Sequence, residues 1–196
     1  LVNPSALTSL IAARELSKHP GSNIIYNLIS SRAVKEVVEE NGGTAVRSRV
    51  GHSYIKKLMA ETDAAFGGEH SGHFYFRDFW KADSGMLAAL HAIAALGESK
   101  KTLSSIFQPF NRYHSSGEIN SAVADSAASM EAIQKKFESD SEVEVDHLDG
   151  LTVSAKDWWF NLRASNTEPL LRLNVEAATE GRMVKVRDEV LKAIRS

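Results

Sequence analysis

The sequence predicts a three-layer α/β domain followed by a smaller α+β domain with a mostly antiparallel sheet. Strand-like and helix-like segments alternate over the first half of the chain, which is typical of a sheet with helices on its faces. The stretch 108–117 then combines a proline, a glycine, an asparagine and two serines, all of which favour turns. Beyond it, two helix-like segments enclose four short strand-like ones. We therefore expect domains at residues 1–112 and 113–196.

In the first domain, each expected helix carries apolar residues at helical spacing or a signal for its start or end. Pro4 suits a first turn, and Pro20-Gly21 ends the same helix. Ser31 is a plausible cap for the next helix, and Asp83 or Ser84 for a later one. The expected order is helix 4–18, strand 23–28, helix 31–40, strand 44–47, helix 53–61, strand 64–66, strand 73–76, helix 83–96 and helix 102–107.

In the second domain, the segments are short and alternate in polarity, which favours half-buried strands. Trp158-Trp159 lies in one of them, so at least one of the two rings should belong to the core. The expected order is strand 118–123, helix 126–137, strands 143–146, 150–155, 158–163 and 170–176, and helix 180–194. A few helices against such a sheet form an α+β layer.

Composition narrows the functional class. The chain of 196 residues has a formal net charge of −2 and 43% hydrophobic residues, which fits a folded globular protein. Nothing in that charge indicates a nucleic-acid or membrane partner. No apolar run reaches the roughly 18 residues of a membrane span. The absence of cysteine excludes disulfides and thiolate metal sites and is compatible with the cytoplasm, where we expect the protein.

Two polar loops carry the chemistry. The first, 67–73, reads Gly-Gly-Glu-His-Ser-Gly-His and could bind sugar hydroxyls. An ionised Glu69 can accept from two adjacent hydroxyls, and Ser71 can donate or accept. A zinc site is a poor alternative, because the order Glu69-His70-x-x-His73 differs from that of the helical zinc proteases and the glycine disfavours a helix.

The second loop, 163–169, reads Arg-Ala-Ser-Asn-Thr-Glu-Pro and could bind a phosphate. Arg163 supplies a planar fork of donors that suits phosphate oxygens. Ser165 and Thr167 add hydroxyls, and Asn166 adds an amide. Each loop by itself also fits a plain surface turn. Their occurrence together favours two halves of a phosphosugar site.

Both loops resemble motifs of the alpha-D-phosphohexomutases, in the phosphomannomutase and phosphoglucomutase branch. The sugar motif Gly-Glu-x-Ser-Gly-His matches residues 68–73, and the phosphate motif Arg-x-Ser-Asn/Gly-Thr-Glu-Pro matches residues 163–169. A third motif, basic-x-Gly-His-Ser, is similar to residues 49–53. The order and spacing of the motifs agree across nearly the whole chain.

The resemblance implies a role for each site residue. Ring hydroxyls of the sugar are contacted by Glu69 and Ser71, with His52 and Arg49 beside them. At position 29 some relatives place a lysine near the sugar, whereas this chain has Ile29, so that contact is lost or comes from elsewhere. The residues that the resemblance assigns to the phosphate are Arg163, Ser165, Asn166 and Thr167.

The resemblance also implies that the chain is the third and fourth domain of a four-domain enzyme. Such enzymes interconvert hexose 1-phosphate and hexose 6-phosphate through a phosphorylated serine, a bound Mg²⁺ and a hexose 1,6-bisphosphate intermediate. The serine and Mg²⁺ loops belong to the first two domains, so we expect this chain to bind hexose phosphate, to depend on those N-terminal domains and to be inactive alone. Two alternatives stay open: an amino-sugar mutase, which His52 and Asn166 disfavour, and a non-catalytic phosphosugar-binding module.

Overall fold

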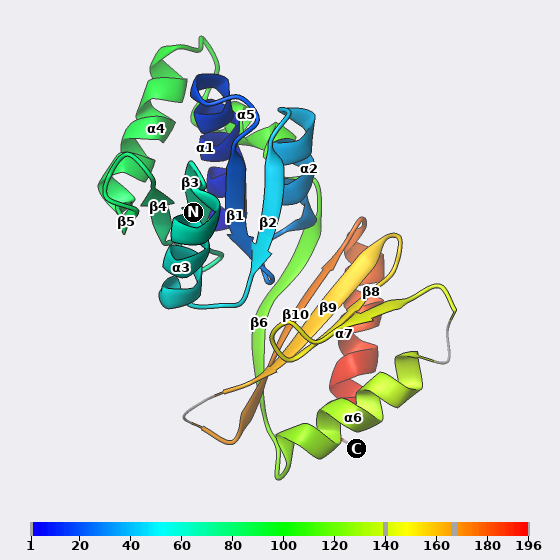
Figure 1. Cartoon of the computed structure of the whole chain (residues 1–196). Coiled ribbons are helices and arrows are strands. Elements are labelled where there is room, and N and C mark those ends of the chain that lie inside the picture. Colours follow the sequence, from blue (N-terminus) through cyan, green and yellow to red (C-terminus); the bar gives the residue numbers. More distant parts are fainter. Residues whose placement is uncertain (1, 139–140, 166–167, 196) are drawn as a thin grey trace. The chain divides into compact units, whose positions relative to one another are not determined.

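The computed structural model describes residues 2–138, 141–165 and 168–195. It divides into two compact units, one ending at Arg112 and the other beginning at Tyr113. The first unit is built on a mixed sheet and the second on a fully antiparallel sheet (Figure 1). The predicted fold class is therefore confirmed.

The first domain contains a five-stranded sheet in the order β2-β1-β3-β4-β5. Its helices are α1 (Pro4–Lys18), α2 (Arg32–Glu40), α3 (His52–Thr62), α4 (Gly85–Gly97) and α5 (Leu103–Phe107), with a short 3-10 helix η1 (Gln108–Phe110). Its strands are β1 (Asn23–Asn27), β2 (Thr44–Ser48), β3 (Phe66–Gly68), β4 (Phe74–Phe76) and β5 (Ala82–Asp83).

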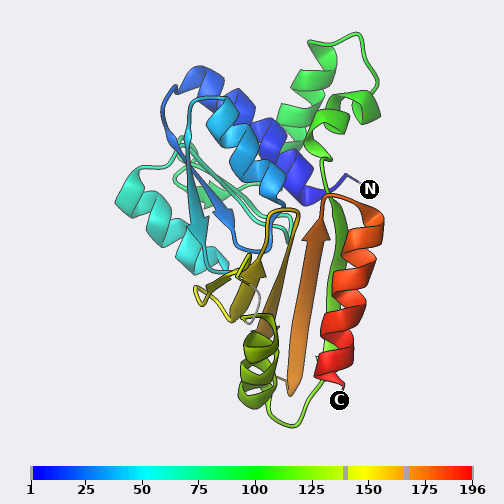
Figure 2. The same cartoon turned by 90° about the vertical axis from the view of Figure 1, so that its right-hand side faces the viewer.

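Helices cover both faces of this sheet. Ile24 of β1 packs with residues of α1, α2 and α4 on one face, while the next residue, Ile25, packs with Ile55 and Met59 of α3 on the other. This follows from strand geometry, since successive side chains point to opposite faces. Figure 2 shows α1 and α2 on one side of the sheet and α3 on the opposite side. The result is three layers.

Strand direction brings three loops to one edge of the sheet. β1 is parallel to both β2 and β3, so the carboxyl ends of the three strands lie at the same edge. In α/β sheets this is the edge where ligands bind. The loops that leave it begin after Asn27, Ser48 and Gly68, and two of them carry the predicted sugar-binding residues.

Helix starts agree with the capping signals in the sequence. Asn3 caps α1 by accepting from the Ser5 amide at 2.8 Å, and Ser31 caps α2 by accepting from the Ala33 amide at 3.2 Å. Such a cap contributes about 1 kcal/mol. For α4 the cap is Ser84 and not Asp83.

The glycines before the sugar loop are packing residues. The strand β3 comprises residues 66–68 and not 64–66, so Gly67 and Gly68 belong to the strand. A Cβ at Gly67 would lie 2.9 Å from Ile55 of α3, and one at Gly68 would lie 2.5 Å from Thr8 of α1. Gly67 therefore lets α3 pack closely against the strand, and Gly68 lets α1 do so.

The second domain contains a five-stranded sheet in the order β6-β10-β9-β8-β7. Its strands are β6 (His114–Ala122), β7 (Glu144–Asp146), β8 (Leu151–Ser154), β9 (Trp158–Ala164) and β10 (Leu170–Ala177). Its helices are α6 (Ser126–Phe137) and α7 (Glu180–Ile194), whose bounds agree with the sequence prediction. β6 starts four residues earlier than predicted, inside the stretch we had interpreted as a loop.

Both helices of the second domain lie on one face of its sheet (Figure 1). Their apolar residues pack with Phe160, Leu162, Leu171 and Leu173 in a single core. Because side chains alternate along a strand, the neighbours of these residues point to the face without helices. In the part of the chain that the structure describes, no helix has the length and apolar character to cross a bilayer.

Candidate functional site

The turn after β3 is closed by its own backbone. The amide of Glu69 donates to the carbonyl of His73 at 2.9 Å, and the amide of Gly72 donates to the carbonyl of Glu69 at 3.0 Å. Gly72 has a φ of +88°, a conformation that side chains rarely adopt. Ser71 lies in this turn and is exposed, so its hydroxyl is accessible to a ligand.

The carboxylate of Glu69 is buried and accepts three hydrogen bonds from the protein. Only 2% of the residue is exposed. Its Oε1 accepts from the hydroxyl of Tyr75 at 2.8 Å, and its Oε2 accepts from the amide of Gly51 at 3.2 Å and from Nδ2 of Asn27 at 3.4 Å. Glu69 therefore connects β1, β4 and the turn before α3, a role that the loop motif did not predict.

Tyr75 is a fixed donor in this network. Burial, and then the hydrogen bond to Glu69, raise the pKa of its hydroxyl above the ordinary value, so the proton stays on the tyrosine. Asn27 is also fully buried and accepts at Oδ1 from Ser30 Oγ at 2.8 Å and from the His70 amide at 3.4 Å. The sugar loop is thus held in one conformation by buried polar groups.

The turn before α3 carries Arg49 and His52 close to this network. Gly51, with a φ of +128°, donates its amide to Glu69 and precedes the helix. His52 is the first residue of α3 and is exposed. Arg49 is also exposed, and its guanidinium lies 4.8 Å from the centre of the Tyr54 ring. The structure brings this turn together with Glu69, as the predicted sugar site requires.

Other residues near the loop have structural partners. His73 Nδ1 lies 2.7 Å from Oδ2 of Asp83 in β5. His70 Nδ1 lies 3.3 Å from the hydroxyl of Ser5. Ile29 is 7% exposed and belongs to the buried residues of the domain.

In the second domain, Arg163 lies on the face of the sheet without helices. It pairs in register with Arg172 of β10, directly opposite. Both guanidinium groups approach Glu118 of β6, at 3.8 Å from Arg163 and 3.6 Å from Arg172. Arg172 also donates to Oγ of Ser165 at 3.4 Å. Two cations thus share one carboxylate beside the predicted phosphate loop.

The ends of the phosphate loop are joined through the backbone. The amide of Ser165 donates to the carbonyl of Leu170 at 2.9 Å, and the carbonyl of Pro169 accepts from the amide of Val123 at 3.2 Å. The backbone carbonyl of Glu168 accepts from the amide of Leu170 at 2.8 Å. The predicted phosphate residues Asn166 and Thr167 lie outside the described residues.

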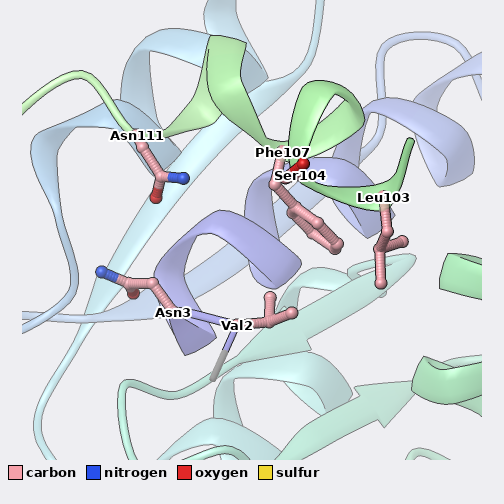
Figure 3. A pocket seen from close by; sticks show the side chains of 6 residues that line it. All are labelled: Val2, Asn3, Leu103, Ser104, Phe107 and Asn111. Carbon is pink, nitrogen blue, oxygen red and sulfur yellow. The ribbon is translucent and has the colours of Figure 1, made fainter. Parts of the chain in front are cut away.

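A cavity in the first domain does not suit an anionic sugar. It has a volume of about 450 Å³ and lies between the start of α1 and α5. Figure 3 shows two asparagines on one side and apolar side chains on the other; the lining residues are Val2, Asn3, Leu103, Ser104, Phe107 and Asn111. It offers no charged group. Among the described residues, no group of three or more His, Cys, Asp or Glu side chains could hold a metal ion.

Sequence reasoning missed the groups that surround the motif residues. Asn27 and Tyr75 hold Glu69, while Glu118 lies against Arg163. Asn27 is a polar residue at the end of an apolar strand, and this pattern could have indicated that it contacts a site residue. The position of Arg172 opposite Arg163 follows from the strand register.

Comparison with known proteins places both domains in one family. Residues 3–113 match the model described as phosphoglucomutase/phosphomannomutase, alpha/beta/alpha domain III. Residues 118–193 match the model described as the phosphoglucomutase/phosphomannomutase C-terminal domain.

Individual relatives agree with these matches. A phosphomannomutase of Methanocaldococcus jannaschii is 44% identical over 94% of the chain, and one of Salmonella typhimurium is 39% identical over 96%. A solved structure of a family protein from Burkholderia thailandensis superposes with a TM-score of 0.86 at 28% identity and covers 99% of the chain. The chain spans only 40%, 41% and 42% of these proteins, respectively.

Proposed function

Because the chain belongs to the phosphoglucomutase/phosphomannomutase family, we propose that it is the hexose-orienting and phosphate-binding part of a phosphohexomutase. The reaction of the whole enzyme is the interconversion of hexose 1-phosphate and hexose 6-phosphate. In this proposal the first domain binds the sugar ring and the second binds the phosphate that is not reacting. Positioning of this kind supplies much of the catalysis in phosphoryl transfer.

The single observation that carries the proposal is the arginine pair of the second domain. Arg163 and Arg172 share one carboxylate, so the cluster keeps a surplus positive charge. Guanidinium groups bind phosphate oxygens through two parallel hydrogen bonds. Ser165 adds a hydroxyl beside them, and Asn166 and Thr167 complete the proposed phosphate loop.

We propose that Glu69 contacts one ring hydroxyl and not two adjacent ones. A carboxylate offers about four acceptor positions. Tyr75, Gly51 and Asn27 occupy three of them, which leaves one position on Oε1. We assign one ring hydroxyl to that position and the neighbouring hydroxyl to exposed Ser71. His52 and Arg49 border the same loop, and Arg49 is our candidate for the cation that Ile29 does not supply.

Other groups that the reaction needs belong to the longer enzyme. A phosphorylated serine would transfer the phosphoryl group, a Mg²⁺ would neutralise its developing charge, and a hexose 1,6-bisphosphate would be the intermediate. The described residues do not fit a metal site, so no step is assigned to Mg²⁺ in this chain. The chain by itself is expected to bind hexose phosphate without turnover, in the cytoplasm.

The test is titration of the chain with glucose 1-phosphate and mannose 6-phosphate, followed by amide NMR shifts. We expect shifts around Ser71 and around Ser165. Arg163→Ala should abolish binding, Ser71→Ala should weaken it, and Arg187→Ala should not change it, because Arg187 pairs with Asp188 on α7.

Two results would contradict the proposal. Binding that survives Arg163→Ala would remove the phosphate loop from the site. Turnover of hexose 1-phosphate by the chain alone would show that it contains catalytic groups we have not assigned. In a longer protein that contains this chain, binding without turnover would favour a phosphosugar-binding module.

A further inference from the structure

The turn 147–150, between β7 and β8, is tied to the second sheet by one buried amide. Nδ2 of Asn161, in the middle of β9, donates to the carbonyl of Asp149 at 3.0 Å and to that of Leu151 at 3.4 Å. It also donates to Oγ1 of Thr152 at 3.0 Å. Because carbonyl oxygens only accept, the nitrogen and not the oxygen of the Asn161 amide must face the turn. The residue is fully buried.

The same turn lies directly against the backbone of Arg163. Gly150 has a φ of +75°, and a Cβ there would collide with the carbonyl oxygen of Leu162 and lie 3.1 Å from Cα of Arg163. Only glycine allows so close an approach in this conformation. Asn161 and Arg163 are two positions apart on β9, so their side chains point to the same face, the one without helices. The turn therefore borders the arginine that we assign to phosphate.

The side chain of Arg163 is enclosed although no helix covers this face. It is 17% exposed, and its Nε is buried. The turn 147–150 is one of the elements that enclose it, since Gly150 lies against its backbone. A guanidinium group that is already ordered loses little conformational freedom when it binds an anion, and this saving strengthens binding. Whatever holds the turn in place thus also helps to order Arg163.

We propose that Asn161 is a positioning residue of the phosphate site: by holding the turn 147–150 on β9, it keeps the guanidinium group of Arg163 in the orientation that receives a phosphate. This inference rests on the proposed function of the loop at 163–169. Asn161 acts through Arg163 and touches no ligand itself. A purely structural Asn161 would instead stabilise the sheet and leave the phosphate affinity of the folded chain unchanged.

The test is calorimetric or NMR titration of the whole chain with inorganic phosphate at low ionic strength, with folding checked by tryptophan fluorescence. Asn161→Ala should weaken phosphate binding roughly two- to tenfold, because Arg163 must then be ordered by the ligand. Gly150→Ala displaces the same turn from its other side and should have a similar effect. If the alanine variants do not fold, Asn161→Ser is the milder change and should weaken binding in the same direction.

The matched control is Asn174→Ala. Asn174 is the cross-strand neighbour of Asn161 on β10 and is 4% exposed, so its truncation disturbs the same row of the sheet. Phosphate should bind to this variant as it does to the wild type. Equal weakening by Asn174→Ala and Asn161→Ala would show that any loss of packing in the sheet lowers the affinity, and the inference would be wrong.

A double-mutant cycle separates positioning from a general loss of stability. Arg163→Lys keeps a cation but removes the planar fork whose orientation matters. In that background, Asn161→Ala should weaken phosphate binding by less than about twofold, because the two changes act on one contact. The same weakening in both backgrounds would mean that Asn161 does not act through Arg163.

The outcomes also separate this inference from the proposed function. If Arg163→Ala loses phosphate while Asn161→Ala and Gly150→Ala bind like the wild type, the inference is wrong and the phosphate loop stands. If Arg163→Ala binds normally, or if the wild type binds no phosphate, the proposed function fails and the inference fails with it.

Discussion

Glu69 in the first domain and Glu118 in the second are both carboxylates at proposed binding sites, yet their surroundings differ. Glu69 is buried and accepts from Tyr75, Gly51 and Asn27. Glu118 is about one-third exposed and only approaches two arginines at 3.6–3.8 Å. The first carboxylate has three of its four acceptor positions occupied by neutral donors, whereas the second is outnumbered by cations.

This difference separates two ways of preparing a ligand site. In the sugar loop, buried hydrogen bonds fix the conformation, and little acceptor capacity remains for the ligand. In the phosphate site, unbalanced charge keeps the capacity for an anion at the expense of local stability. Substitutions should therefore affect folding at Glu69 and binding at Arg163.

The largest expected effect follows from Glu69→Ala. This change leaves the Tyr75 hydroxyl, the Gly51 amide and the Asn27 amide without their acceptor in a buried region. We expect the first domain to lose roughly 3–5 kcal/mol of unfolding free energy. Denaturant unfolding followed by the amide signals of residues 23–76 measures it. A loss below about 1 kcal/mol would mean that solvent reaches these donors.

A smaller effect is expected from Tyr75→Phe, which keeps the ring in the core and removes only the hydroxyl. The loss should be about 1–2 kcal/mol, because one buried hydrogen bond disappears. In a double-mutant cycle with Glu69→Gln, the two changes should not add, because both act on one contact. Additive losses would show that Tyr75 stabilises the domain by packing alone.

In the second domain, Arg163→Ala should change stability by less than about 1 kcal/mol, because a partly exposed ion pair is weak and a repulsion is relieved. Phosphate binding should nevertheless be lost. The fluorescence of buried Trp158 and Trp159 reports unfolding of this domain. A large loss of stability would mean that the arginine is a structural residue, and the contrast with Glu69 would disappear.

The smallest expected effect is a pH dependence of the stability of the first domain. Burial lowers the pKa of His91, which stacks on Phe76 and lies 3.5 Å from Glu15. Below the ordinary pKa of 6.5 the unfolded chain binds a proton that the folded chain resists, so stability should fall as the pH falls.

His91→Gln should reduce that loss between pH 7 and pH 5, and His147→Gln in the second domain should not. Unfolding curves at the two pH values measure the difference. An equal pH dependence in the wild type and His91→Gln would contradict this assignment.

Most of the fold was predictable because local signals agreed with tertiary structure. The helices α6 and α7 have the bounds that the sequence predicts, and in the structure Asp125 and Thr179 cap them. The strand β3 was misplaced by two residues, because glycines in sequence usually indicate a turn. Only the packing of α1 and α3 against Gly67 and Gly68 explains why this strand contains them.

The site was predictable at the level of loops and not of contacts. Glu69 and Arg163 were recognisable from their motifs and residue chemistry. That Tyr75 and Gly51 would occupy the Glu69 carboxylate depends on the closure of the turn and on the pairing of β3 with β4. That Arg172 would face Arg163 depends on a register that no local signal sets.

The contact between Gly68 and Thr8 has a consequence for how this sequence can evolve. Any side chain at position 68 collides with the Thr8 branch, and a Cβ there would still be 3.0 Å from that of Thr8 itself. A change at either position therefore alters which residues are permitted at the other. Positions 8 and 68 should covary among homologous sequences, with glycine retained at 68 wherever a branched residue occupies position 8.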